Sequence, residues 1–182
     1  MASQSSTWVL GCLGGPNSGK STLAAELFVH MKKEGYRVEF LQEYAKKLVW
    51  EKDWDTLNNQ YHVSHKYYKT IQAMDGKVDF IILDSSLLNG LWYNRNNKDN
   101  TSNVEKTQEM ILKWYYQFNN INFFIHRGSY EYQVEGRKES EQESKIIDKE
   151  LQQILFNLAI TWTPIPVDNL SIEKMMDKIN CG

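Results

Sequence analysis

Cysteine and proline are scarce in this chain of 182 residues, which has two of the first and three of the second. The two cysteines, Cys12 and Cys181, lie near opposite ends of the sequence. No disulfide framework is therefore indicated, and we expect a reducing, cytoplasmic compartment. No spacing of histidine, cysteine and acidic residues is typical of a zinc site, which argues against a zinc-dependent function.

Long apolar runs and a strong charge imbalance are also missing. Residues 1–7 are polar and have neither a basic start nor an apolar stretch, so we expect no signal peptide, membrane anchor or membrane partner. The net charge of −2 gives no overall attraction to nucleic acid, although a local basic groove is compatible with it. The length, without repeats or linkers, predicts one domain over residues 1–182 that buries a sizeable core.

One stretch dominates what is present, Gly14-Gly15-Pro16-Asn17-Ser18-Gly19-Lys20-Ser21-Thr22. Its first eight residues fit the pattern G-x-x-x-x-G-K-[ST], a loop whose backbone N–H groups surround phosphate oxygens. The apolar run 8–13 before it predicts a buried strand, and residues 20–34 after it predict a helix, which is the context that the motif requires. We therefore expect this loop to bind ATP, through Gly14, Asn17, Ser18, Gly19, Lys20, Ser21 and Thr22.

Two side chains of the loop have specific expected roles. Lys20 is predicted to reach the β- and γ-phosphates, and the Ser21 hydroxyl is predicted to bind Mg²⁺. Asp84 is the second predicted metal ligand, because it closes the apolar run 78–84 as a Walker-B-type acid does. The alternative for Asp84 is a structural one, in which it caps the helix that follows.

The rest of the chain alternates between strand-like and helix-like patterns. Besides the first strand and helix, strands are predicted at 36–42, 78–84, 121–126 and 161–167, and helices at 43–50, 55–74, 86–93, 104–118, 143–160 and 170–179. This alternation predicts an α/β fold with a parallel sheet covered on both faces, and the prolines of the last strand suit an edge. Ligands bind at the carboxyl ends of such strands. Candidate functional residues are therefore the ones that follow strands: Glu43, Asp84 and Arg127.

Glu43 and the charged connection at about 127–142 supply the predicted catalytic groups besides Lys20. Glu43 is expected to bind or deprotonate an attacking hydroxyl. Its alternative is a first-turn acid favoured by the helix dipole, which would leave Asp84 as the base. The connection is expected to act as a lid that brings Arg137 and Arg127 to the γ-phosphate, because phosphoryl transfer needs cations there. Lys138 is expected to face solvent.

The region 44–68 is rich in aromatic and amide side chains, which suit a nucleobase. Most of its aromatic rings are expected to pack in the core. Gln60 is harder to explain by packing, because it interrupts an apolar helix face. Together with Glu43, the predicted acceptor-binding residues are Tyr44, Lys47 and Gln60. The lysines of this region also suggest a groove for a DNA strand, made by Lys46, Lys47, Lys66 and Lys69.

Four segments carry a resemblance to a known family. They are the loop at 14–22, Gln-Glu-Tyr-Ala-Lys at 42–46, Ile-Leu-Asp-Ser-Ser-Leu-Leu-Asn-Gly-Leu-Trp-Tyr at 82–93 and Tyr-Gln-Val-Glu-Gly-Arg at 132–137. In this order they resemble the small P-loop kinases of the nicotinamide riboside kinase-like group, including phage-encoded nucleotide and 5-hydroxymethyluracil DNA kinases. Deoxynucleoside kinases are more distantly similar.

The resemblance implies a P-loop NTPase fold, a three-layer α/β/α sandwich whose five-stranded parallel sheet has the order 2-3-1-4-5. It also implies that Glu43 contacts or activates the acceptor and that Arg137 is the lid arginine. This chain departs from the family where Lys46 and Lys47 replace a frequent arginine, and near Ser86, where proline or arginine is frequent. Both departures lie beside the acceptor site, so they affect which acceptor is bound.

The expected function is therefore a Mg²⁺-dependent kinase that moves the γ-phosphate of ATP to a hydroxyl of a nucleoside-type acceptor. The acceptor is either a free nucleoside or nucleotide, or 5-hydroxymethyluracil in phage DNA. The alternative is a P-loop ATPase or switch without a small acceptor, either stimulated by DNA or independent of it, although no water-positioning segment or extra interaction domain supports it. The acceptor hydroxyl, the oligomeric state and the preferred phosphate donor stay open.

Overall fold

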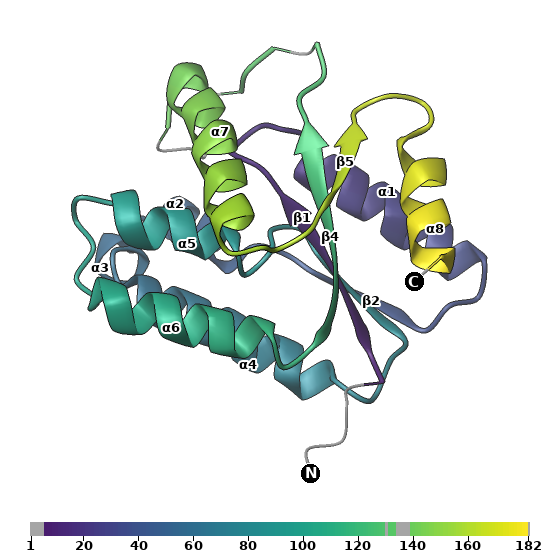
Figure 1. Cartoon of the computed structure of the whole chain (residues 1–182), viewed down its shortest axis with the longest axis horizontal. Coiled ribbons are helices and arrows are strands. Elements are labelled where there is room, and N and C mark those ends of the chain that lie inside the picture. Colours follow the sequence, from purple (N-terminus) through teal and green to yellow (C-terminus); the bar gives the residue numbers. More distant parts are fainter. Residues whose placement is uncertain (1–5, 130, 134–138, 182) are drawn as a thin grey trace.

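A five-stranded sheet forms the centre of the computed structural model, which describes residues 6–129, 131–133 and 139–181 (Figure 1). All neighbouring strands are parallel, and their order is β2-β3-β1-β4-β5. Both the α/β class and the order 2-3-1-4-5 are thus confirmed. The strands are β1 Trp8–Leu13, β2 Val38–Leu41, β3 Phe80–Leu83, β4 Asn119–His126 and β5 Thr163–Pro166.

Helices cover both faces of this sheet. In Figure 1, α1 and α8 lie together on one side, and α4 to α7 lie on the other. The three layers of the predicted sandwich are therefore present. The helices are α1 Lys20–Lys33, α2 Tyr44–Glu51, α3 Trp54–Leu57, α4 Gln60–Met74, α5 Asn89–Asn96, α6 Val104–Tyr115, α7 Glu141–Asn157 and α8 Ser171–Asn180.

Strand β1 shows why the central strands are continuously apolar. Side chains alternate across a sheet, so Val9 and Leu13 join the core cluster under α4 to α7, whereas Leu10 and Cys12 join the cluster under α1 and α8. A strand buried on both faces is therefore mostly apolar. The edge strand β5 is different, because it tolerates the prolines that the sequence analysis placed at an edge.

One predicted helix is wrong. Residues 55–74 belong to two helices, α3 and α4, and a side chain caps the start of each. Asp53 accepts a hydrogen bond from the amide of Thr56, and Asn59 accepts one from the amide of His62, at 2.9 Å. Such caps favour a new helix start over a continuous helix. The break turns the chain, so that α2, α3 and the start of α4 surround one cavity.

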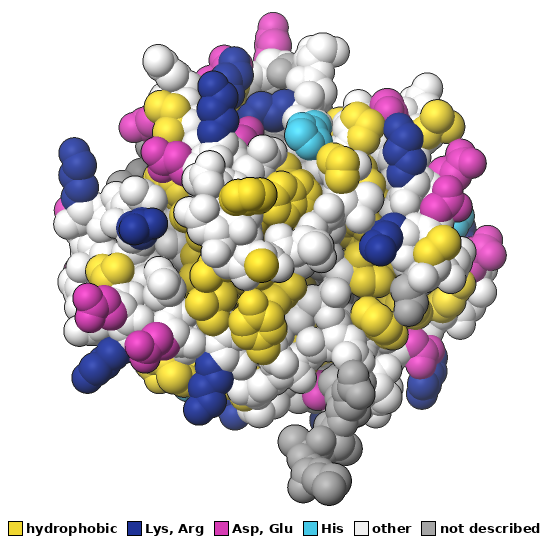
Figure 2. All heavy atoms as spheres, in the orientation of Figure 1, with side chains coloured by type: hydrophobic (Ala, Val, Ile, Leu, Met, Phe, Trp, Pro, Cys, Tyr) yellow, Lys and Arg dark blue, Asp and Glu magenta, His cyan; other side chains and the backbone are white. Residues whose placement is uncertain are grey.

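Charged side chains of both signs are interspersed on the face shown in Figure 2. This mixture agrees with the small net charge of the chain. Across the described ranges, no helix is both long enough and apolar enough to span a bilayer.

Candidate active site

The loop between β1 and α1 has the backbone that the glycine pattern requires. Gly14 and Gly19 have φ angles of 134° and 100°, which a residue with a Cβ rarely adopts. The Lys20 ammonium donates a hydrogen bond to the carbonyl of Gly15 at 2.8 Å, so the side chain folds back over the loop. Ser18 is fully buried, and its hydroxyl has no partner among the described residues.

The strands next to this loop bring two carboxylates to it. The backbone amide of Asp84 donates to the Leu41 carbonyl of β2 at 3.1 Å, and that of Ser86 donates to the Cys12 carbonyl of β1 at 2.8 Å. The turn after β3 is thereby tied to both neighbouring strand ends. As a result, Asp84 and Glu43 lie beside Lys20 at the carboxyl edge of the sheet, where parallel α/β folds bind their ligands.

Lys20 is a buried cation in acidic surroundings, with 8% of its surface exposed. Burial lowers its pKa from the usual value, and the nearby charges of Glu43 and Asp84 oppose that shift. Asp84 is buried as well, and its Oδ1 has no hydrogen-bond partner in the described part of the chain. A buried carboxylate oxygen with free lone pairs is a suitable ligand for a hydrated cation.

Glu43 stands at the start of α2, but its side chain makes no capping hydrogen bond to that helix. Instead it lies close enough to the Ser85 side chain for that group to lower its pKa. Burial raises the pKa of Glu43 above the usual carboxyl value, and the charges of Asp84 and Glu139 add to the increase, whereas Lys20 and the Ser85 side chain oppose it. A carboxylate with a raised pKa is a better proton acceptor, which is what a general base requires.

Two adjoining cavities meet at Glu43. One, of about 910 Å³, is lined by the phosphate-binding loop from Gly14 to Thr22 and by Tyr132 and Val167. The other, of about 640 Å³, is lined mainly by α2, α4 and α5. Both include Glu43, Ser85, Asn89 and Tyr93 in their walls. The arrangement can hold a phosphate donor in the first cavity and a second molecule in the other, with a carboxylate between them.

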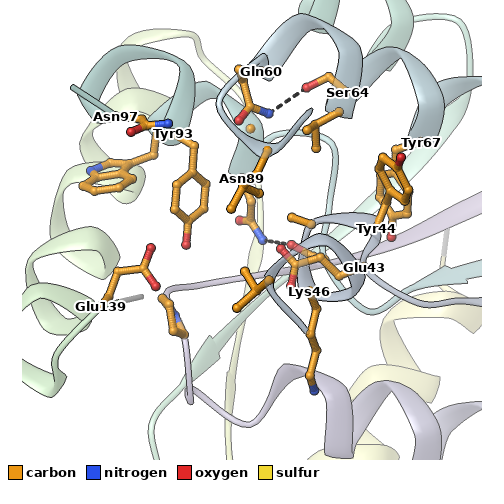
Figure 3. Close-up of a pocket in the computed structure, with 18 of the residues that line it drawn as sticks. Glu43, Tyr44, Lys46, Gln60, Ser64, Tyr67, Asn89, Tyr93, Asn97 and Glu139 are labelled. Carbon is orange, nitrogen blue, oxygen red and sulfur yellow. Dashed lines mark hydrogen bonds between the residues drawn. The ribbon is translucent and has the colours of Figure 1, made fainter. Parts of the chain in front are cut away.

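The second cavity has polar groups at both of its ends (Figure 3). At one end the Gln60 amide donates to the Ser64 hydroxyl at 2.9 Å. Gly90 backs this pair, and a Cβ there would lie 3.0 Å from both side chains. At the other end the Tyr93 hydroxyl faces the Glu139 carboxylate. Burial raises the pKa of Tyr93, and the charge of Glu139 adds to the increase. Of these residues, the sequence analysis predicted a role for Gln60 alone. The one sequence signal for Tyr93 was its place in segment 82–93, which resembles the kinase family.

The predicted acceptor residues are only partly brought together. Tyr44 and Gln60 line the 640 Å³ cavity. Lys47 lines neither cavity, which corrects the expectation for it: its ammonium pairs with Glu51 at 3.2 Å on the exposed side of α2. Successive residues of a helix point in different directions, so Lys46 takes the place at the cavities.

The four lysines of the predicted DNA groove do not gather at these two cavities. Lys69 donates to Gln72 at 2.6 Å and lies over the ring of Tyr68, on the outer side of α4. Neither Lys66 nor Lys69 lines one of the two cavities. Lys46 is therefore the only member of the predicted set at either of these cavities.

Of the two predicted lid arginines, only Arg127 lies within the described residues. Arg137 and Lys138 lie outside the described residues. Arg127 follows β4 and is held against the phosphate-binding loop: its guanidinium donates to the Asp148 carboxylate at 2.6 Å and to the Pro16 carbonyl at 2.8 Å. The side chain is thus anchored at the loop and 16% exposed.

Comparisons with known proteins agree with this geometry. A family model described as "AAA domain" matches residues 12–173. No curated protein matches the chain. Among solved structures, deoxyadenosine kinase from M. mycoides, determined with dCMP and dCDP, has a TM-score of 0.62 and 19% identity, over 96% of this chain and 100% of that one.

Two further structures are similar over nearly the whole of this chain. NadR in complex with NAD and AMP-PNP has a TM-score of 0.68 and 14% identity; the alignment covers 96% of this chain and 49% of that one. Thymidylate kinase from Candida albicans has a TM-score of 0.59 and 15% identity, over 98% of this chain and 92% of that one. At such identities the likeness is one of fold, and the fold is that of the P-loop kinases.

Proposed function

The chain belongs to the AAA domain family, and from that premise we propose that it is a Mg²⁺- and ATP-dependent kinase that phosphorylates a hydroxyl of a nucleoside-type acceptor. One observation carries the proposal: Glu43 lies at the junction of a phosphate-binding cavity and a second cavity. An ATPase or switch needs only the first of these. A kinase needs both, with a proton acceptor between them.

ATP takes the 910 Å³ cavity in this proposal. The loop amides from Asn17 to Thr22 bind its phosphates, and Lys20 unfolds from the Gly15 carbonyl to reach the γ-phosphate. The Ser21 hydroxyl lines this cavity, and Asp84, whose Oδ1 has no hydrogen-bond partner among the described residues, lies near Lys20. Both side chains supply oxygen ligands, which Mg²⁺ prefers. When bound, Mg²⁺ neutralises charge on the transferring phosphoryl group.

No cluster of three His, Cys, Asp or Glu side chains suited to a metal occurs within the described ranges. Such a sparse protein shell is typical of Mg²⁺ bound largely through nucleotide phosphates and water.

The acceptor takes the 640 Å³ cavity, and a hydroxyl suits it better than a phosphate. Glu43 lies at its inner end and Glu139 lines it too, so two carboxylates would repel an incoming phosphate. The described cations that line it, Lys46 and Lys98, are both exposed. A hydroxyl can donate to Glu43 without charge repulsion. A nucleoside, a nucleotide whose own phosphate stays at the lysines, and an extruded 5-hydroxymethyluracil of DNA all meet this condition.

Acceptor-dependent phosphate transfer is the direct test. Labelled ATP and Mg²⁺ are offered with a panel of nucleosides, nucleotides and 5-hydroxymethyluracil-containing DNA, and label in each acceptor and ADP are measured. We expect ADP formation to rise with one class of acceptor and label to appear in it. Phosphate release that no acceptor stimulates would instead identify an ATPase. Label in DNA alone would assign the polymeric acceptor.

The metal assignment leads to a prediction for Asp84. Asp84→Asn should raise the Mg²⁺ concentration needed for half-maximal rate and lower kcat, because a neutral amide binds a hydrated cation less strongly than a carboxylate. The Mg²⁺ dependence of the initial rate at saturating ATP measures both effects. Asp79→Asn is a suitable control, since this carboxylate precedes β3 at the opposite edge of the sheet and pairs with Arg37 in solvent. An unchanged Mg²⁺ dependence and rate in Asp84→Asn would refute the assignment.

A further inference from the structure

Helix α7 presents a polar pair of residues at the top of an apolar face. The helix begins with a capping box, in which Ser140 accepts from the amide of Glu143 and the Glu143 carboxylate accepts from the amide of Ser140. From this fixed start, Ile147, Leu151 and Leu155 are buried. Ser144 and Asp148 lie four residues apart in the first turns, so they share one side of the helix. That side faces the phosphate-binding loop.

Asp148 connects two groups of the nucleotide site. One of its carboxylate oxygens accepts from the backbone amide of Gly15 at 2.6 Å. The other accepts from Arg127 at 2.6 Å, and Arg127 in turn donates to the Pro16 carbonyl. The Ser144 hydroxyl also donates to the Pro16 carbonyl. The first half of the loop is thus held by α7 and by Arg127.

The approach of α7 to the loop is close enough to exclude a side chain at Gly15. A Cβ there would lie 2.5 Å from the Ser144 carbonyl and 2.9 Å from the Ser144 hydroxyl. Position 15 is an unrestricted position of the sequence motif. In this chain it must nevertheless be glycine, because the backbone of α7 occupies the space. The contact is therefore a built feature that involves both the loop and the helix.

We propose that Asp148, with Ser144, is a positioning residue of the nucleotide site, which sets the conformation of Gly15 and Pro16 so that the loop amides that follow are ready for phosphates. This inference depends on the proposed phosphate-binding role of the loop. Asp148 is 18% exposed and Arg127 16%, so their opposite charges offset each other in a partly buried place. Arg127 neutralises the charge of Asp148. The Asp148 carboxylate can therefore bind the Gly15 amide without repelling the phosphates expected at the adjacent site.

Binding of AMP-PNP, a non-hydrolysable ATP analogue, tests the proposal without any acceptor. Isothermal titration should show about 10-fold weaker binding for Asp148→Ala, since a hydrogen bond to a charged group is lost. Asp148→Asn should lie between the wild type and Asp148→Ala, because its amide oxygen still accepts from Gly15 whereas its NH2 group cannot accept from Arg127. Lys145→Ala is the matched control: it removes an exposed pair with Glu141 on the same helix and leaves the loop contacts intact.

Two further measurements separate positioning from mere stability. The Gly15 amide resonance should move in Asp148→Ala and not in Lys145→Ala. The KM for the acceptor at saturating ATP should change less than 2-fold in Asp148→Ala. Wild-type AMP-PNP affinity in Asp148→Ala, or an Asn variant as weak as the Ala variant, would overturn the proposal. If Asp148→Ala weakened AMP-PNP binding and raised the acceptor KM by the same factor, and also lowered the melting temperature, the proposal would be overturned too. Such a result would mean that Asp148 only stabilises the fold. Failure of the wild-type chain to bind AMP-PNP would refute the proposed function instead.

Discussion

Replacement of Lys20 by alanine should abolish phosphate transfer while the chain stays folded. The ammonium lies at the phosphate-binding loop beside Glu43 and Asp84, and burial lowers its pKa. Burial of this charge is unfavourable for folding, so its removal should not destabilise the chain. Its removal takes away the cation expected at the β- and γ-phosphates. Loss of one preorganised group of this kind lowers kcat by roughly 10³-fold. The measurement is ADP formation with acceptor present, together with a thermal melt.

Two comparisons make the Lys20 result specific. Lys32→Ala removes another lysine of α1, one that is exposed and pairs with Glu39, and it should leave the rate unchanged. Lys20→Met keeps the length of the buried stem, so it should melt like the wild type and be as inactive as the alanine variant. Near-normal turnover by either Lys20 variant would show that this loop is not the site of the transferred phosphate.

The sequence predicted the features that depend on local pattern. The strands were found because burial on both faces makes them continuously apolar, as in β1 and β3. The loop was found because positive φ angles at Gly14 and Gly19 restrict those positions to glycine. Glu43 and Asp84 were chosen as neighbours because parallel strands end at one edge of the sheet. The order of the strands came from the family resemblance, since the pattern alone does not give it.

What the sequence did not predict depends on packing between distant segments. Nothing in the sequence distinguishes Asp148 from the other acidic residues of α7. Only its place opposite the loop, 133 residues earlier in the chain, gives it the Gly15 amide as a partner. The sequence alone does not distinguish Lys46 from Lys47, since they are neighbouring residues of the same type. The orientation of α2 about its own axis decides that Lys46 lines the cavities, whereas Lys47 pairs with Glu51. The helix break at Asn59 was missed because apolar spacing continued across it, although the Asn59 side chain caps the start of a second helix.

Glu43→Gln should separate phosphate transfer from simple ATP hydrolysis. Glutamine keeps the size of the side chain, so AMP-PNP affinity should be almost unchanged. It cannot accept the proton of the acceptor hydroxyl, so acceptor-dependent transfer should fall by roughly 10²–10⁴-fold, the usual size of a general-base contribution. Background hydrolysis should fall much less, because water does not need the carboxylate in the same place. Glu51→Gln is the matched control, since Glu51 lies on the same helix and pairs with Lys47 on its exposed side.

The pH dependence of the wild type gives the same assignment a second measurement. Because the pKa of Glu43 is raised by burial and by neighbouring carboxylates, the base form disappears as the pH falls through a value above that of an ordinary carboxyl group. Acceptor-dependent kcat/KM should therefore decline on the acid side at that higher pH, and the decline should be absent in Glu43→Gln. Equal losses of transfer and hydrolysis in the variant would mean that Glu43 supports the metal site or the fold. No loss in either activity would leave Asp84 as the base.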